Sequence, residues 1–208
     1  MKIFTFIACI ILAVACPAQP KYGMRLGAIW TYGNQNASGE LVTYGSSITS
    51  YSVGLFTDVE LGYRTSLNIG ASYEERQVAY DVNVPGVVFG IFGPMPSFSQ
   101  VNAKDRFQYL AVPVFLEYSP VDRLGFSSGP QLGVLLDVNS ETIGRSFNTR
   151  EFASDIDVSW GVGVEFQGER STLGVRYNYG LADLNSPGVE GSKYHTNTLH
   201  VFLAATFN

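Results

Sequence analysis

The feature that constrains this chain most is an alternation of apolar with small or polar residues, which recurs in eight stretches from Tyr22 onward. Successive side chains of a β-strand point to opposite faces, so each stretch predicts a strand with one apolar face. Most stretches are about 8 to 13 residues long, near the roughly 9 to 11 residues of a tilted membrane-spanning strand. The alternation therefore predicts an all-β fold of eight strands.

The apolar face of each predicted strand is formed by every second residue. In chain order these residues are Met24, Leu26, Ala28 and Trp30; Val53, Leu55, Val59 and Leu61; Leu67, Ile69, Ala71 and Tyr73; Leu110, Val112, Val114, Leu116 and Tyr118; Leu132, Val134, Leu136 and Val138; Ile156, Val158, Trp160, Val162, Val164 and Phe166; Leu173, Val175, Tyr177 and Tyr179; and Leu199, Val201, Leu203, Ala205 and Phe207.

The opposite face combines glycines and charged residues with Phe56, Phe115 and Phe202. Mid-strand glycine would weaken a solvated strand, whereas in a narrow lumen it makes room for large neighbours. We therefore expect this face inside a barrel and the apolar face toward lipid, where a Lys or Arg at the midplane would cost about 2 to 4 kcal/mol. All four lysines are accordingly expected outside the strands: Lys2, Lys21, Lys104 and Lys193.

The predicted connections alternate in length. Short turns are expected at residues 62–65, 119–123 and 168–171, whereas the other four connections run to roughly 14 to 27 residues, against a usual median of about 5. Outer-membrane barrels show this asymmetry, with short periplasmic turns and long outer loops. The sequence thus predicts an eight-stranded antiparallel up-and-down transmembrane β-barrel in the outer membrane of a Gram-negative bacterium, with both termini periplasmic.

The N-terminus has the pattern of a targeting segment. An apolar run over residues 3–14 follows Lys2 and leads into small residues. We expect residues 1–18 to be a cleaved signal peptide and residues 19–208 to form the outer-membrane β-barrel domain. An alternative, a lipoprotein box with Cys16 acylated, stays open.

Composition argues against several classes of function. Thirteen Lys and Arg against eighteen Asp and Glu, without a basic run, give no reason to expect a nucleic-acid partner. Beyond residue 18 there is no Cys pair and no His-x-x-x-His spacing, so no metal or other cofactor is expected. His195 and His200 invite a hydrolase interpretation, but no Gly-x-Ser-x-Gly element marks a nucleophile. We therefore expect no catalytic residue and no enzyme.

Charged residues of the polar face are expected in the lumen. They are Arg25, Asp58, Glu60, Glu74, Glu117, Asp137, Asp155, Asp157, Glu165, Arg176 and His200. A barrel of eight strands is just wide enough for side chains to fill it, so these groups predict a structural ion network and not a channel. Strand direction places five of them together toward the periplasmic end: Arg25, Glu60, Glu117, Glu165 and Arg176.

The second long connection, residues 78–104, is unusually apolar for a loop. A polar stretch over residues 74–77 indicates that the chain has left the membrane, yet residues 84–96 carry many large apolar groups. Such exposed patches often mark partner contacts. The candidate partner residues are Val87, Val88, Phe89, Ile91, Phe92 and Met95. A lid over the barrel mouth, or a hairpin that extends the third and fourth strands, are the alternatives.

Five segments of the chain follow patterns known from one family. They are YLAVPVFLEY (109–118), GPQLGVL (129–135), DID (155–157), WGVGVE (160–165) and RYNYGLADL (176–184). In these segments the chain resembles the outer-membrane β-barrel domain family that includes PorT-like proteins. The resemblance is good over the fourth to eighth strands and weak before them, and Ala111 stands where a polar residue is more usual.

The resemblance implies a small outer-membrane barrel and leaves activity open. Some relatives are implicated in protein secretion and gliding, which would imply an accessory role in secretion or surface assembly. The expected partners are outer-membrane lipid, the barrel-assembly machinery during biogenesis, and a protein that contacts residues 78–104. We expect a non-enzymatic structural or interaction protein; the alternatives are a membrane-embedded lipid hydrolase and a periplasmic lipocalin-like ligand-binding barrel.

Overall fold

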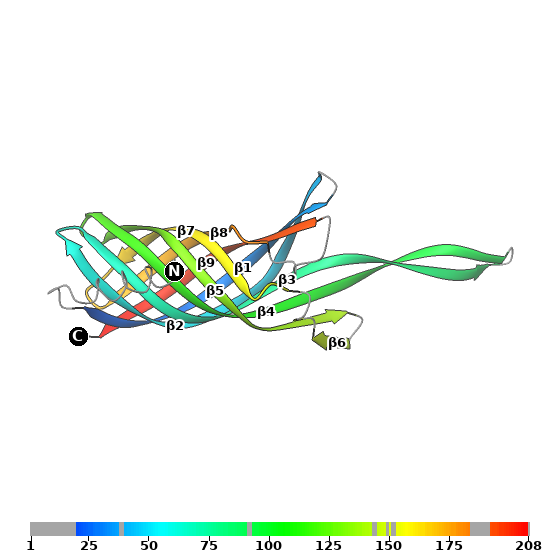
Figure 1. Cartoon of the computed structure of the whole chain (residues 1–208), viewed down its shortest axis with the longest axis horizontal. Helices are drawn as coiled ribbons and strands as arrows, with labels where there is room; N and C mark the ends of the chain where they lie inside the picture. Colours follow the sequence, from blue (N-terminus) through cyan, green and yellow to red (C-terminus); the bar gives the residue numbers. More distant parts are fainter. Residues whose placement is uncertain are drawn as a thin grey trace, which may run out of the picture.

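The computed structural model describes residues 20–37, 40–90, 93–142, 145–148, 150, 153–183 and 192–207 (Figure 1). The strands in these ranges are β1 (Lys21–Ala37), β2 (Glu40–Gly62), β3 (Thr65–Gly90), β4 (Gly93–Val121), β5 (Leu124–Thr142), β6 (Arg145–Asn148), β7 (Ile156–Gln167), β8 (Ser171–Gly180) and β9 (Ser192–Phe207). The described part of the chain holds no helix long and apolar enough to cross a membrane. The predicted signal peptide, with Cys16, lies outside the described residues.

The strands close into one antiparallel sheet. The neighbour order is β4-β3-β2-β1-β9-β8-β7-β5-β6, and β4 also pairs with β5, which closes the circle. Strand β6 is a short addition to the outer end of β5. Eight strands therefore form the wall in up-and-down order, so the predicted fold class is confirmed, and β6 was not predicted.

The alternation sorts the two faces as predicted. Leu55 and Leu203, on the apolar face, are more than half exposed, whereas Phe115 and Phe202, on the other face, are buried. Val59 departs from this pattern because it is buried although it belongs to the apolar face. The apolar residues thus form an outer belt, and the aromatic rings of the second face fill the inside.

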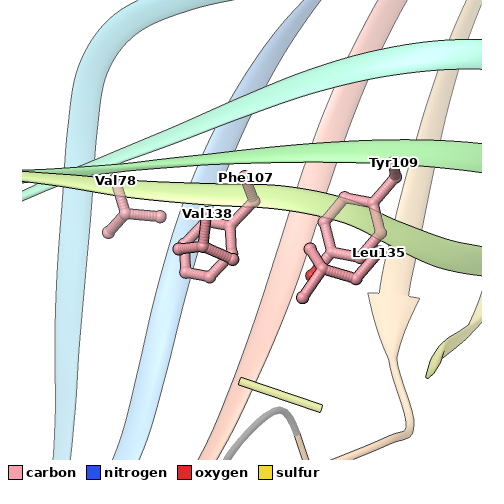
Figure 2. Packing of buried hydrophobic residues seen from close by; sticks show 5 residues of the cluster. All are labelled: Val78, Phe107, Tyr109, Leu135 and Val138. Carbon is pink, nitrogen blue, oxygen red and sulfur yellow. The ribbon is translucent and has the colours of Figure 1, made fainter. Parts of the chain in front are cut away.

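Strand β5 contains a bulge that the sequence did not reveal. Gln108 pairs with Asp137, but the next residue of β4 pairs with Leu135, so β5 has one extra residue at this point. A bulge reverses the alternation beyond it. Val138 therefore points inward, where it packs in a cluster with Val78, Phe107, Tyr109 and Leu135 (Figure 2), and its predicted place on the outer face was wrong.

The long connections are mostly strand and not loop. Strands β3 and β4 stay paired from Val78 and Asp105 to Gly90 and Gly93, so residues 78–104 form a hairpin that extends far beyond the barrel (Figure 1). This is the hairpin alternative of the sequence analysis.

The length of these strands also corrects the prediction for the lysines. Because the strands continue past the apolar belt, Lys21, Lys104 and Lys193 lie within β1, β4 and β9. The short turns and the C-terminal end of β9 lie at one end of the barrel, on the left in Figure 1, and the long hairpins lie at the other.

Candidate functional site: the filled lumen

Aromatic rings pack against glycines across the lumen. A Cβ atom on Gly161 would lie 2.5 Å from the Cε1 atom of Phe115, and a Cβ atom on Gly174 would collide with the ring of Phe202. Both rings are buried. Glycine is therefore required at these positions by the close approach of the rings.

A buried ion network fills the half of the lumen nearer the long hairpins. The Arg76 guanidinium donates to Glu74 Oε2 at 2.8 Å and to Asp157 Oδ2 at 2.5 Å. It also lies 4.6 Å from the centre of the Tyr109 ring, and Gln131 donates to Glu74 Oε1 at 3.0 Å. All five side chains are at most 3% exposed. Arg76 thus ties β3 to β7, two strands that are not neighbours in the sheet.

Arg76 is the central residue that the sequence analysis missed. The polar stretch over residues 74–77 was interpreted as chain that has left the membrane, and only Glu74 of this stretch was expected in the lumen, whereas Arg76 is buried there as well. The signal available in the sequence was their spacing: two residues apart in a strand share a face. The position of Asp157 in the lumen agrees with its place on the polar face.

A second ion network lies nearer the short turns. Arg176 donates to Glu165 Oε1 at 3.1 Å, and its guanidinium stacks 3.7 Å from the centre of the Phe115 ring. Arg25 lies over the rings of Phe202, at 4.5 Å, and Phe56, at 4.9 Å. Two guanidinium groups therefore lie against the Phe202 ring, since Arg176 is 5.1 Å from its centre.

The carboxylates around this second network have different partners. Arg25 reaches Asp58 through Asn68, which accepts from Arg25 at 3.3 Å and donates to Asp58 at 2.5 Å. Glu117 is buried, and its Oε2 atom accepts from the Ser66 hydroxyl at 3.5 Å. The structure thus places four of the five expected network residues close together.

Glu60 is the fifth expected member, and it lies apart. It forms an ion pair with Lys21 at 2.7 Å, and both side chains are more than half exposed. Lys21 begins β1 and Glu60 lies two residues before the end of β2, and both line the mouth of the lumen. Glu60 faces the lumen side, but solvent reaches it there.

Two further lumen predictions were wrong. Asp137 precedes Val138 beyond the bulge and therefore faces away from the lumen, where it accepts from Asn139 and Asn148 at 2.7 Å each. Asp155 precedes β7, where strand alternation does not yet apply, and it is exposed beside Arg150 at 3.6 Å.

The two histidines are engaged with groups of the barrel. His200 is buried in the lumen, with Nε2 3.1 Å from the Thr198 hydroxyl. His195 places Nδ1 2.8 Å from the Ala182 carbonyl oxygen. Among the described residues no group of three or more His, Cys, Asp or Glu is arranged to hold a metal ion.

The space left in the lumen is small in the middle and wide at one mouth. A cavity of about 20 Å³ lies between the two ion networks, lined by Glu74, Gln131, Arg176, His200 and Phe202 among others. This volume is enough for about one water molecule. A vestibule of about 1140 Å³ opens at the short-turn end, with Arg25 and Glu117 in its lining. The vestibule ends at the side chains of the second network.

A closed antiparallel barrel with an apolar outer belt and a charged, filled lumen is a transmembrane β-barrel of the outer-membrane type. Each of the eight wall strands pairs with a neighbour on both sides, as strands that cross a bilayer require. The chain belongs to the outer membrane protein beta-barrel domain family, whose model matches residues 18–186. The protein is accordingly located in the outer membrane.

Comparison with solved structures returns other small outer-membrane proteins. The attachment invasion locus protein Ail of Yersinia pestis is 11% identical, with 91% of this chain and 99% of that chain covered and a TM-score of 0.48. OprG from Pseudomonas aeruginosa is 11% identical, with 92% and 97% covered and a TM-score of 0.43. The protease OmpT from Escherichia coli is 9% identical, with 90% and 96% covered and a TM-score of 0.45. No curated protein matches the chain.

Four of the six candidate partner residues lie on the β3–β4 hairpin. Val87, Val88 and Phe89 belong to β3 and Met95 belongs to β4, and the structure describes their backbone only. Ile91 and Phe92 lie outside the described residues. The register pairs Val87 with Pro96 and Val88 with Met95.

Proposed function

We propose that this protein is a non-enzymatic outer-membrane barrel whose β3–β4 hairpin is a surface for binding another protein. The observation that carries this proposal is the length of the hairpin, which continues for thirteen register pairs from Val78 and Asp105 to its tip. A membrane anchor alone does not need such an extension, because the barrel closes below it. An apolar sequence on a ribbon outside the barrel favours contact with a partner.

The orientation of the barrel in the membrane follows from the asymmetry between its short turns and its long connections. Outer-membrane barrels keep short turns in the periplasm and long connections outside. On this basis both termini are periplasmic, the vestibule opens to the periplasm, and the hairpin stands outside the cell. A surface position of the hairpin fits an accessory role in secretion or surface assembly.

The lumen supports a structural and not a catalytic role. A lipid hydrolase of this architecture needs its histidine at the lipid-facing surface, whereas His200 is buried against Thr198. His195 is bound to the Ala182 carbonyl. The buried charges pair with one another and with aromatic rings, which is the arrangement of a plug.

The test is to shorten the hairpin without disturbing the barrel. Val84 pairs with Ser99, so replacement of residues 85–98 by Asn-Gly leaves a two-residue turn at a register that the hairpin already has. Folding is measured as heat-modifiable gel mobility, and partners are recovered by crosslinking and affinity purification from outer membranes. Intact folding with a specific partner lost supports the proposal.

A matched control shortens the other long hairpin by the same rule. Gln35 pairs with Val42, so Asn-Gly in place of residues 36–41 trims the β1–β2 hairpin. This variant should keep the partner. Retention of every partner by the β3–β4 variant would show that the hairpin is not the contact surface.

A further inference from the structure

The outer part of the β3–β4 hairpin is a two-stranded ribbon. Strand β2 pairs with β3 only as far as Glu74, and β5 pairs with β4 only from Ala103 inward. Within the described chain, residues 79–90 and 93–102 therefore have a strand neighbour on one side only, and Figure 1 shows the ribbon extending away from the other strands. Two strands alone are marginally stable in water. Their outer edges present unpaired backbone N–H and C=O groups.

The register shows which backbone groups point outward. Strands β3 and β4 pair without a shift, but the ladder skips two positions between Ile69–Val114 and Ser72–Ala111. Pro113 lies in that gap and has no N–H to donate. The missing bond explains the gap if the backbone N–H and C=O groups of the odd-numbered residues of β4 point toward β3. The backbone groups of an antiparallel strand point alternately to its two sides, so those of the even-numbered residues of β4 point away from β3.

The prolines of the hairpin fall on the outward-pointing set. On β4 that set is 94, 96, 98, 100 and 102, and it begins with Pro94 and Pro96. Near the tip, Pro94 and Pro96 remove two N–H donors from the β4 edge. At the base, the pairing of β4 with β5 begins at Ala103. Three outward positions with an N–H group remain between these limits: 98, 100 and 102.

The β3 edge is more open. Its outward set is 79, 81, 83, 85, 87 and 89, in which Pro85 alone lacks an N–H. Ala79, Asp81 and Asn83 can each donate and accept, and two further positions follow beyond the proline. Prolines commonly protect one edge of a sheet from unwanted pairing. Five outward N–H groups thus remain on β3 against three on β4, so β3 is the more open edge for another strand.

The alternation of β3 indicates what kind of strand would fit. Tyr80, Val82 and Val84 occupy one face of the ribbon by register, and Ala79, Asp81 and Asn83 occupy the other. A partner strand with apolar residues on the first face and polar residues on the second would extend both faces. A second copy in the same membrane has its β3 in the same direction, so β3 could pair with the β3 of that copy only in parallel.

We propose that the edge of β3 at residues 79–83 binds an extended segment of another polypeptide, with alternating apolar and polar residues, as an added antiparallel strand. Main-chain hydrogen bonds supply the affinity and the alternate side chains supply the specificity. This inference rests on the proposed function, because it specifies how the hairpin makes its contact.

The test uses the full-length barrel in lipid nanodiscs and a synthetic peptide of alternating Thr and Val with terminal lysines. Amide hydrogen exchange is followed residue by residue. The amides of Ala79, Asp81 and Asn83 should slow by about tenfold or more on addition of the peptide, and the amide of Asn102 should not change. Protection on β4 instead, or no protection on either strand, would overturn the proposal.

A pair of proline variants isolates the edge. Asp81 pairs with Asn102, so Asp81→Pro and Asn102→Pro remove matched outward N–H groups from the two edges and spare the bonds between β3 and β4. Asp81→Pro should raise the Kd of the peptide by about tenfold or more, and Asn102→Pro should leave it unchanged. Asn83→Pro replaces Asp81→Pro if the latter alters heat-modifiable mobility.

Failure of this inference is distinguishable from failure of the proposed function. Equal peptide affinity for the wild type and both proline variants overturns strand addition at β3. Loss of a partner on replacement of residues 85–98 would still support the hairpin as a contact surface.

Discussion

Arg76 and Asp157 are 81 positions apart in the chain, yet Nη1 of Arg76 lies 2.5 Å from Oδ2 of Asp157 inside the lumen. Their strands, β3 and β7, are not neighbours in the sheet. The ion pair therefore crosses the lumen between two parts of the wall that are separated by β4 and β5, below the point where the long hairpin begins.

Arg76→Ala should destabilise the barrel more than any substitution at an exposed ion pair. It leaves Glu74 and Asp157 buried without their cation, which costs about 3 to 5 kcal/mol. The measurement is reversible urea unfolding in lipid vesicles, followed by tryptophan fluorescence. Arg150→Ala is the control, because Arg150 pairs with Asp155 at the surface, and such pairs contribute about 1 kcal/mol or less. Equal midpoints for both variants would contradict the role given to Arg76.

Comparison of Arg176→Ala with Arg176→Lys should separate the contribution of the charge to the unfolding free energy from that of ring stacking. The alanine variant removes the partner of Glu165 and should lose on the order of 3 kcal/mol of unfolding free energy. Lysine keeps the charge but lacks the planar guanidinium that lies over Phe115, so its loss should be smaller, about 1 to 2 kcal/mol. Unfolding in urea gives both values. An unchanged midpoint for Arg176→Ala would place this side chain in water.

The sequence predicted the parts of the lumen that alternation alone determines. Glu165 and Arg176 follow the alternation of their strands, and strand direction predicts that they lie at the same depth. Arg76 was missed because a continuous polar stretch hides the alternation. Asp137 and Val138 were misplaced because the bulge in β5 depends on pairing with β4, which is not local in sequence. The hairpin was predicted as a loop because its apolar run is broken by prolines.

Gly174→Ala should destabilise the barrel by about 1 to 3 kcal/mol through overpacking. The added Cβ would meet the ring of Phe202, which is buried and packs against Arg25 and Arg176. Gly62→Ala is the control, since a Cβ there has no atom within 4 Å, and it should change stability by less than about 0.5 kcal/mol.

A second substitution tests the cause of this loss. Phe202→Leu shortens the side chain that the new Cβ meets, so the double variant with Gly174→Ala should be less destabilised than the sum of the single variants. A coupling energy above about 0.5 kcal/mol is expected from the double-mutant cycle. Strict additivity would show that Gly174 is needed for another reason.

The wild-type barrel should not conduct ions measurably in a planar bilayer, because two side-chain layers close its lumen in series. The layer nearer the hairpins is Arg76 with Glu74 and Tyr109, and the layer nearer the short turns is Phe202 with its two guanidinium groups. Only about 20 Å³ lies between them, which holds about one water molecule and no hydrated ion. Closure in series predicts that Phe202→Ala alone, or Tyr109→Ala alone, leaves the barrel closed, whereas both together increase conductance. Heat-modifiable mobility first selects the variants that fold. Stable ohmic steps from the wild type, or from Phe202→Ala alone, would show that the layers do not close the lumen as described.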